Sequence, residues 1–462
     1  MAKLLAIAAL LFALVLAGGT AAAGAGAAPP PGTAAPAAAG GKGKIHKAWP
    51  QKKNGRKPNR NLARRLARQV GPVTAKPRAG DAAPVGIEAS EERDLAPVSG
   101  GPLLVDTGGK GSTPSGAKLL LVRSFDIPKD DKLYPALVNY SWTYDNALAA
   151  LGFVADKDRP QARQLLDQLA LLQNKNGSWD FAFNVMTGES APIQRSNAVA
   201  WVALAGLAFA DKYGEKTYDE MTGAAIRWLL EQRDAKTGLL RGGPDVSWVS
   251  TQHNLLASEA LREAAELTGG SHRFGSFTSE ELAGAEAKLD KAIEERLLIN
   301  GGTNFRETYF RAGLGDDRIP ADVQALGSMY LRHRTEQPLS LYVVANLLVH
   351  KAWFLGPRPT KAASNQVSGL APFRGEGAPD VIWSEGTFQA QMALVRLKAK
   401  DSIIAPAAKS LEETNRPGTV GPIGADRDSA SSFGEYRTWP TSAAASWLLM
   451  TKLEGDVLLF SK

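Results

Sequence analysis

The sequence predicts an all-α protein, an (α/α)6 toroid over residues 118–462 that follows a disordered N-terminal region. Three observations predict it. Apolar segments of helical length recur after residue 118, with Gly-, Pro- and Asp-rich breaks between them. These segments alternate between two burial types. Polar residues open the more apolar type at a recurring spacing.

The two burial types indicate two concentric layers of helices. Residues 160–172 carry Leu165, Leu166, Leu169 and Leu172 on one stripe, and 216–233 and 278–297 are of the same charged, striped type. Segments 147–155, 198–210, 385–397 and 441–450 are instead rich in small apolar residues on every face. A helix that is apolar all round must be buried all round, whereas a striped helix buries one side. We therefore expect an inner and an outer layer.

The spacing of the polar openings predicts six units. From Asp145 through Asn197, His253, Asp322 and Glu385 to Thr441, the successive intervals are 52, 56, 69, 63 and 56 residues, the size of a helical hairpin. Six hairpins closed on themselves make a toroid whose inner helices all point the same way. Inner helices are expected to start near residues 142, 195, 251, 321, 384 and 440, with their N-terminal ends at one mouth.

The N-terminal region is predicted to consist of an export signal and a linker. A basic start, the apolar run Leu4–Ala17 and small residues after it predict a signal peptide over 1–25 and a secreted or periplasmic protein. Residues 26–117 are predicted to be a disordered basic, Pro- and Gly-rich linker. Within it, 61–68 fits either a short basic helix on an anionic envelope polymer or membrane, or a solvated tail.

The net charge of +7 belongs to this region, because Lys42–Arg78 holds 13 Lys and Arg and no acid. From Ala79 onward 47 acids outnumber 40 bases, so we expect no nucleic-acid partner for the folded part. The chain has no Cys, which excludes disulfides and thiolate metal sites, and its five His residues never pair at ligand spacing. No metal or cofactor is predicted, and the oligomeric state is left open.

The predicted mouth collects polar and aromatic side chains. Asp145, Asp322 and Glu385 are the candidate catalytic carboxylates, and the neighbouring candidates for substrate binding are Tyr144, Arg195, Asn197, Gln252, His253 and Asn254. Each polar residue has a second interpretation as a helix-capping residue. Trp142, Trp383 and Trp439 lie beside the same helix starts, where aromatic faces suit the C–H faces of sugar rings. Lids over the core are the alternative role for these tryptophans.

The region from Asn139 to Leu449 resembles secreted carbohydrate-active proteins of the six-hairpin (α/α)6 superfamily. The segments that carry the resemblance are Trp142–Ala150, Val249–Leu255, Asp322–Leu326 and Trp383–Gln389. The Ser384-Glu385-Gly386 helix entry is similar to the catalytic-acid motif of family 8 glycoside hydrolases, which implies a general-acid role for Glu385. The second signature of that family, a Thr-Asp-Gly-Asp segment, is absent, and Tyr144-Asp145-Asn146 substitutes for it only loosely.

These observations predict an enzyme that hydrolyses glycosidic bonds of a poly- or oligosaccharide. Such hydrolysis needs one protonated and one ionised carboxyl group. We assign Glu385 as the acid and Asp145 as the base, with Asp322 as the reserve base. One alternative is a polysaccharide lyase with His253 as base and Tyr144 as acid, in which Arg195 and Arg311 neutralise a uronate. The other is a non-catalytic glycan-binding or assembly protein, to which Gln252 in place of a carboxylate would be suited.

Overall fold

The computed structural model describes residues 60–73, 118–300, 308–332, 349–353, 366–398, 403–415, 419–431 and 434–453. All of them fall within one unit of the chain, Asn59–Lys462. The signal peptide predicted at 1–25 and most of the linker predicted at 26–117 lie outside the described residues. No helix within the described ranges is long and apolar enough to cross a membrane.

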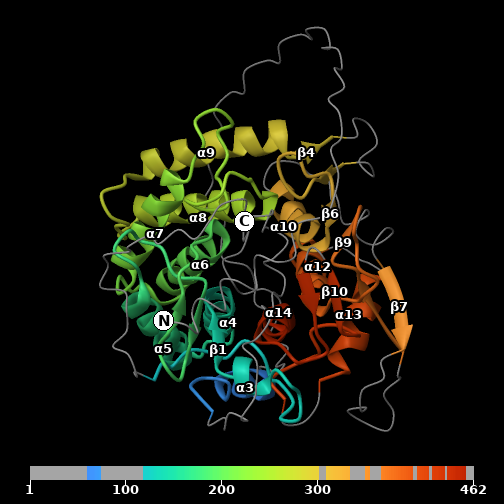
Figure 1. Cartoon of the computed structure of the whole chain (residues 1–462). Coiled ribbons are helices and arrows are strands. Elements are labelled where there is room, and N and C mark those ends of the chain that lie inside the picture. Colours follow the sequence, from blue (N-terminus) through green and yellow to red (C-terminus); the bar gives the residue numbers. More distant parts are fainter. Residues whose placement is uncertain are drawn as a thin grey trace. The chain divides into compact units, whose positions relative to one another are not determined.

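Six helices form a closed ring, as the sequence predicted (Figure 1). Each packs against the next around the ring, and the last packs against the first. The six are α4 (Thr143–Ala155), α6 (Ser196–Tyr213), α8 (Thr251–Gly269), α10 (Ala321–Arg332), α12 (Ser384–Leu397) and α14 (Ser442–Lys452). Their starts agree with the predicted ones to within two residues. Every residue of α4 is buried, because neighbours cover it on all sides.

Outer helices pack on the outside of this ring. They are α5 (Arg159–Leu172), α7 (Asp219–Glu231), α9 (Ser279–Arg296) and α13 (Ile404–Glu412). The leucine stripe of α5 is buried, as its period predicted. Helix α9 begins with a capping box, in which the Thr278 hydroxyl accepts from the Glu281 N–H and the Glu281 carboxylate accepts from the Thr278 N–H.

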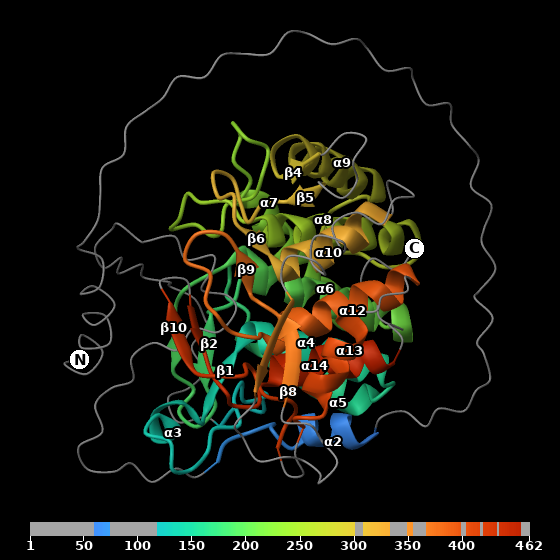
Figure 2. The same cartoon turned by 90° about the vertical axis from the view of Figure 1, so that its right-hand side faces the viewer.

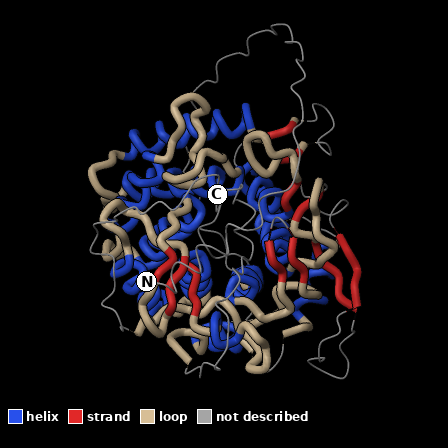
Figure 3. The backbone as a smooth tube through the Cα atoms, viewed as in Figure 1, coloured by secondary structure: helices blue, strands red, loops and turns tan. Residues whose placement is uncertain are grey.

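Short antiparallel strands lie in the connections between the helices (Figure 3). One sheet has three strands, β1 (Tyr140–Trp142), β2 (Ala182–Asn184) and β3 (Ser190–Ala191), with Ser141 opposite Phe183. The other strands form pairs: β4 (Leu298–Ile299) with β5 (Tyr309–Phe310), β6 (Ile319–Pro320) with β9 (Phe373–Arg374), β7 (Val349–Trp353) with β8 (Gln366–Leu370), and β10 (Ser429–Ser431) with β11 (Gly434–Tyr436). Strand β8 packs against α13 (Figure 2). A short helix, α3 (Tyr134–Leu137), precedes β1.

Helix α2 (Arg60–Ala67) corrects the linker predicted over 26–117. Leu62, Ala63 and Leu66 on its apolar face are buried against α14 and α4. The helix thus occupies the outer-layer position beside the junction of the last and first inner helices. Residues 60–73 are therefore part of the folded unit, because the far end of the chain supplies the surface that their short apolar face needs. Neither predicted role for 61–68, surface binding or a solvated tail, describes this packing.

Candidate functional site

A repeated hydrogen bond sets the start of every inner helix. The N–H of the first helical residue donates to a carbonyl in the loop that leads into the next inner helix, at 2.8–3.0 Å. The six pairs run around the ring and close on themselves: Thr143 to Phe181, Ser196 to Gly242, Thr251 to Ala312, Ala321 to Pro372, Ser384 to Gly424, and Ser442 to Ser124. All inner helices consequently begin at the same level, and their N-terminal ends face one mouth.

Side chains reinforce this frame at two positions. At four of the six starts, the hydroxyl of the first residue donates to the carbonyl one residue earlier in the same neighbouring loop, for example Thr251 to Arg311 at 2.6 Å. The fourth residue fixes a loop backbone N–H through its side-chain oxygen in Asn146, Asn254, Gln324 and Thr387. The side-chain amide of Asn254, which was predicted to bind substrate, is hydrogen-bonded to the backbone of Leu240 and Ser250. In this structure it therefore serves the frame.

The frame also corrects the register of the repeat. Equivalent second residues of the six helices are Tyr144, Asn197, Gln252, Asp322, Glu385 and Ala443. The sequence spacing had equated Asp145 and His253 with Asn197, but both are third residues and so lie one position further along. A pattern of Ser or Thr followed three residues later by Asn or Thr marks three of the six starts, those at Thr143, Thr251 and Ser384, and gives the correct register there.

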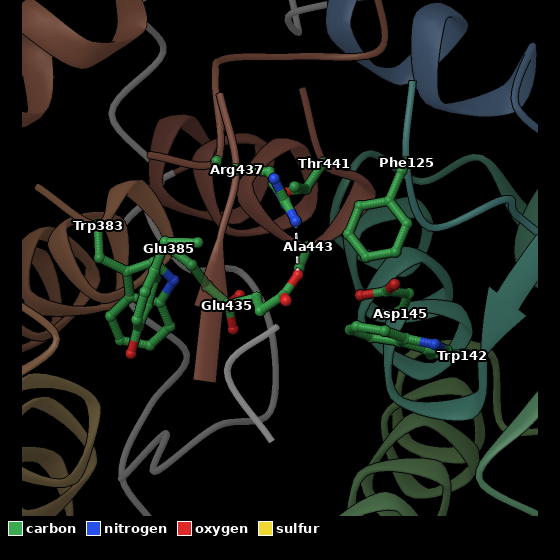
Figure 4. Close-up of a pocket in the computed structure, with 11 residues that line it drawn as sticks. Phe125, Trp142, Asp145, Trp383, Glu385, Glu435, Arg437, Thr441 and Ala443 are labelled. Atoms are coloured by element: carbon green, nitrogen blue, oxygen red, sulfur yellow. Dashed lines mark hydrogen bonds and ion pairs between the residues drawn. The ribbon is translucent and has the colours of Figure 1, made fainter. Parts of the chain in front are cut away.

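Two of the candidate carboxyl groups line one pocket (Figure 4). Asp145 comes from the first turn of α4 and Glu385 from the first turn of α12, and both are almost fully buried. The pocket is lined by Phe125, Trp142, Asp145, Trp383, Glu385, Gly424, Glu435, Tyr436, Arg437, Thr441 and Ala443. Residues far apart in the chain therefore meet where α4, α12 and α14 begin.

Two side-chain donors hold the carboxyl group of Glu385. The Tyr144 hydroxyl and the Gln389 amide, the latter at 3.2 Å, both donate to its Oε1 atom. Burial raises the pKa of Tyr144 well above its ordinary value, with the charge of Glu385 adding to the effect, so this tyrosine stays protonated and remains a donor. Hydrogen bonds donated to a carboxylate stabilise its charged form.

Asp145 lies in a surrounding that favours its protonated form. Burial raises the pKa of this carboxyl group to about 8, a hydrogen bond from Ser124 acts in the opposite direction, and the charge of Glu385 raises it further. Asp145 is therefore mostly protonated at neutral pH. This surrounding favours the reverse of the roles predicted from the sequence, because the acid needs the proton.

The opposite side of the mouth, at the starts of α8 and α10, carries a different pair. The Gln252 amide donates to Asp322 Oδ2 at 2.8 Å. His253 meets the ring of Trp248 edge-on, with 5.4 Å between ring centroids. Asp322 does not line the pocket of Asp145 and Glu385.

The predicted arginines already have acidic partners. Arg195 pairs with Asp245 at 2.7 Å and lies over the ring of Trp248, while Arg311 pairs with Asp317 at 3.2 Å. Asn197 is buried in the first turn of α6 and is not among the residues that line the pocket. Neither arginine lines the pocket either.

Two of the three tryptophans predicted to bind substrate line the pocket, and the third packs outside it. Trp142 and Trp383 line the pocket, although only 6% and 4% of their surfaces are exposed. Trp439 lies outside it, packed against Phe125 with its indole N–H donated to Asp131 at 3.0 Å. Its surroundings match the alternative interpretation, a lid over the core, because it packs in an apolar cluster with Phe125 and the guanidinium of Arg437 lies over its ring.

Two charged pocket residues were missed by sequence reasoning. Glu435 on β11 and Arg437 just after it line the pocket and form an ion pair at 2.7 Å. They lie on and just after a short strand before the sixth helix start, not in a helix, so the repeat spacing could not find them. Within the described ranges, no group of three or more His, Cys, Asp or Glu could hold a metal ion.

No protein-family model matches the chain, and no curated protein matches it. Solved structures do match in fold. An α-amylase from Clostridium perfringens is similar over 75% of this chain and 94% of its own, at 10% identity and a TM-score of 0.51. A structure described as wild-type glycosidase is similar over 75% and 93%, at 10% identity and a TM-score of 0.50. A cellobiose 2-epimerase from Bacillus thermoamylovorans is similar over 75% and 94%, at 9% identity and a TM-score of 0.49. The chain thus shares the fold of the first two structures, an (α/α)6 toroid.

Proposed function

We propose that this protein is a carbohydrate-active enzyme that hydrolyses glycosidic bonds at the pocket between α4, α12 and α14. The observation that carries the proposal is the unequal pair of carboxyl groups in one pocket, Asp145 with its pKa raised to about 8 and Glu385 with two donors on its carboxylate. The names of the fold relatives, an α-amylase and a glycosidase, support the same class of substrate.

In this mechanism Asp145 is the general acid and Glu385 the general base. Asp145 donates its proton to the glycosidic oxygen as the bond to the sugar carbon breaks. Glu385 accepts a proton from a water molecule whose oxygen forms the new bond to that carbon, which is the inverting scheme. Glu435 and Arg437 supply polar groups for sugar hydroxyls, and Trp142 and Trp383 supply apolar walls.

The test is the release of new reducing ends from a panel of poly- and oligosaccharides. We expect Asp145→Asn and Glu385→Gln each to lower turnover by about 10²–10⁴-fold, the usual contribution of general acid–base catalysis, with the mutants still binding glycan. The matched control is Asp219→Asn, which alters a buried carboxylate at the start of outer helix α7, bound to His272. Its turnover per folded molecule should equal that of the wild type.

Three other outcomes would contradict the proposal. Loss of turnover in Asp322→Asn with normal turnover in Glu385→Gln would move the base to the opposite side of the mouth. Products that absorb as unsaturated uronates would identify a lyase instead. Glycan binding at the pocket without cleavage of any member of the panel would identify a binding protein.

A further inference from the structure

Tyr144 and Trp447 meet across the seam, which is the contact between the first and last inner helices, α4 and α14. Tyr144 is the second residue of α4 and Trp447 the sixth residue of α14, and both are almost fully buried. The indole Nε1–H of Trp447 donates to the hydroxyl oxygen of Tyr144 at 3.1 Å. The Tyr144 hydroxyl in turn donates to Oε1 of Glu385, the second residue of α12. A buried chain of two hydrogen bonds thus runs from α14 through α4 to the carboxyl group on α12.

The chemistry of the three groups fixes the direction of both hydrogen bonds. An indole N–H can only donate, so the Tyr144 oxygen is the acceptor for Trp447. The hydroxyl has one proton, and that proton goes to Glu385. Burial raises the pKa of Tyr144 well above its ordinary value, so the proton stays on its oxygen. Because each hydrogen bond polarises the next, a charged carboxylate at Glu385 makes the Tyr144 oxygen a better acceptor for Trp447.

The bond between Tyr144 and Glu385 joins two helices that are not neighbours in the ring. Helix α14 lies between α4 and α12 and packs against both. At the position of α14 that corresponds to Tyr144 and Glu385, the chain has Ala443, whose side chain is only a methyl group. Tyr144 thus reaches past α14 to Glu385, and Trp447, four residues after Ala443 on the intervening helix, donates to its hydroxyl.

The ring of Trp447 is packed against a third aromatic residue, Trp201 of α6. The two indoles meet edge-on with 5.5 Å between ring centroids, and the centroid of Trp201 lies 5.8 Å from that of Tyr144. Trp201 and Trp447 are fully buried. Aromatic rings from α4, α6 and α14 therefore hold the Trp447 indole in place, so its N–H is presented to Tyr144 in one orientation.

We propose that Tyr144 and Trp447 are positioning residues for the carboxyl group of Glu385 and that they couple it to the last inner helix. The role of Glu385 as a base rests on the proposed function, but the two hydrogen bonds do not. Tyr144 was predicted from the sequence to bind substrate, yet it does not line the pocket and its hydroxyl is bonded to Glu385. The other titratable and charged groups at this end of the packed helices are Asp145 on α4, Asp322 at the start of α10, and Glu435 and Arg437 in the pocket.

The first test records the indole N–H signals of the full chain by NMR after isotope labelling of its tryptophans. Trp447→Phe identifies the Trp447 signal by its absence, and backbone assignment replaces this step if that variant does not fold. We expect the Trp447 proton signal to move upfield in Glu385→Gln, which removes the charge from the end of the chain of bonds, and further upfield in Tyr144→Phe, which removes the acceptor. Glu385→Gln keeps the size of the side chain, so it decides the test if Tyr144→Phe does not fold.

The internal control is the signal of Trp179. This residue is equally buried, but its indole N–H donates to Leu169 O at 2.7 Å, outside the chain of bonds to Glu385. Its signal should stay in place in both variants. A Trp447 signal that does not move in Tyr144→Phe would overturn the bond to Tyr144. A signal that does not move in Glu385→Gln would overturn the coupling to Glu385.

The second test uses activity and separates the two proposals. On a cleaved glycan, Tyr144→Phe should lower kcat about 10-fold and Trp447→Phe about 3-fold, each with little change in KM. In both variants the acidic limit of activity should move to higher pH, because the charged form of the base loses support from a donor. Trp447→Phe should have no further effect in a Tyr144→Phe background, since the two residues act through one bond to Glu385.

The matched control for activity is Trp179→Phe, which also removes a buried indole N–H. Its kcat per folded molecule and its pH profile should equal those of the wild type. Equal losses in Trp447→Phe and Trp179→Phe, with no change in either pH profile, would show that Trp447 only packs the core. If the wild type cleaves no glycan, the proposed function fails while the indole signals still decide the roles of Tyr144 and Trp447. If it cleaves and neither variant moves the acidic limit, the positioning role fails alone.

Discussion

The two sides of the mouth share one backbone frame and differ in chemistry. On the pocket side, where α4, α12 and α14 begin, two carboxyl groups lie in unlike surroundings, Asp145 with its pKa raised by burial and Glu385 held by two donors. On the opposite side, where α8 and α10 begin, Gln252 donates to Asp322 and leaves one carboxyl group tied to an amide. The hydrogen bonds that fix the helix starts are equivalent on both sides.

The comparison separates what builds the mouth from what makes it reactive. The first residue of every inner helix and the fourth residue of four of them bind the neighbouring loops, whereas Glu385, a second residue, and Asp145, a third residue, line the pocket. The pocket side is also the seam, where Ser442 meets Ser124 and α2 covers the junction of α14 and α4. The unlike carboxyl groups therefore lie where the fold depends on a distant segment.

The largest expected effect on stability tests that dependence. Leu66 on α2 is fully buried, so Leu66→Ala should lower the free energy of unfolding by about 2–5 kcal/mol in urea titrations. Leu171→Ala, at a 63% exposed position on α5, is the control and should change it by less than about 0.5 kcal/mol. Equal effects of the two variants would contradict the assignment of α2 to the folded unit.

A smaller effect is expected when the opposite side is made to resemble the pocket side. Gln252→Glu replaces the donor to Asp322 with a second carboxyl group at about the same distance. Two carboxyl groups so close resist joint ionisation, which raises the folded pKa of one of them, so the stability it contributes is present at low pH and lost as pH rises.

We expect Gln252→Glu to lower the free energy of unfolding by about 1–3 kcal/mol at pH 8 and by much less at pH 5. Gln164→Glu adds the same charge on outer helix α5, where water still reaches the side chain, and should show little difference between the two pH values. A loss for Gln252→Glu that does not depend on pH would show that the packing of its side chain matters and the charge does not.

The two layers of helices and the starts of the inner helices could be predicted from the sequence. Segments apolar on every face can be stable only inside a ring, and the polar residues that open them recur because each start needs the same hydrogen bonds. The sequence was not sufficient for α2, whose apolar face is short and whose partner surface on α14 and α4 forms only after the ring closes. A basic segment without an extended apolar stripe gave no sign of this packing.

The choice of acid and base depends on how each carboxyl group is buried and what surrounds it. The spacing of residues along the sequence does not contain this information. Asp145 and Glu385 were recognised as a pair, but the choice of acid rested on a resemblance around Glu385. The surroundings that favour the reverse come from the donors Tyr144 and Gln389 at Glu385 and from burial at Asp145, and of the two donors only Tyr144 lies beside either carboxyl group in the sequence. Burial of Trp439 likewise follows from loops before α4 and α14 that meet only in the fold.

The smallest expected effect tests whether the frame is equivalent on both sides. Thr251 on the opposite side and Ser442 at the seam donate their hydroxyls to corresponding loop carbonyls, at 2.6 Å in both cases. Thr251→Ala and Ser442→Ala should each lower the free energy of unfolding by about 0.5–1.5 kcal/mol in urea titrations, since one buried hydrogen bond is lost in each. Ala321 makes its backbone bond without any hydroxyl, so the frame tolerates such a loss at one start. A loss of unfolding free energy several times larger for Ser442→Ala than for Thr251→Ala would contradict this expectation. It would mean that the seam depends on its hydroxyl hydrogen bond far more than the continuous hairpins do. The two sides would then differ in their frame as well as in their chemistry.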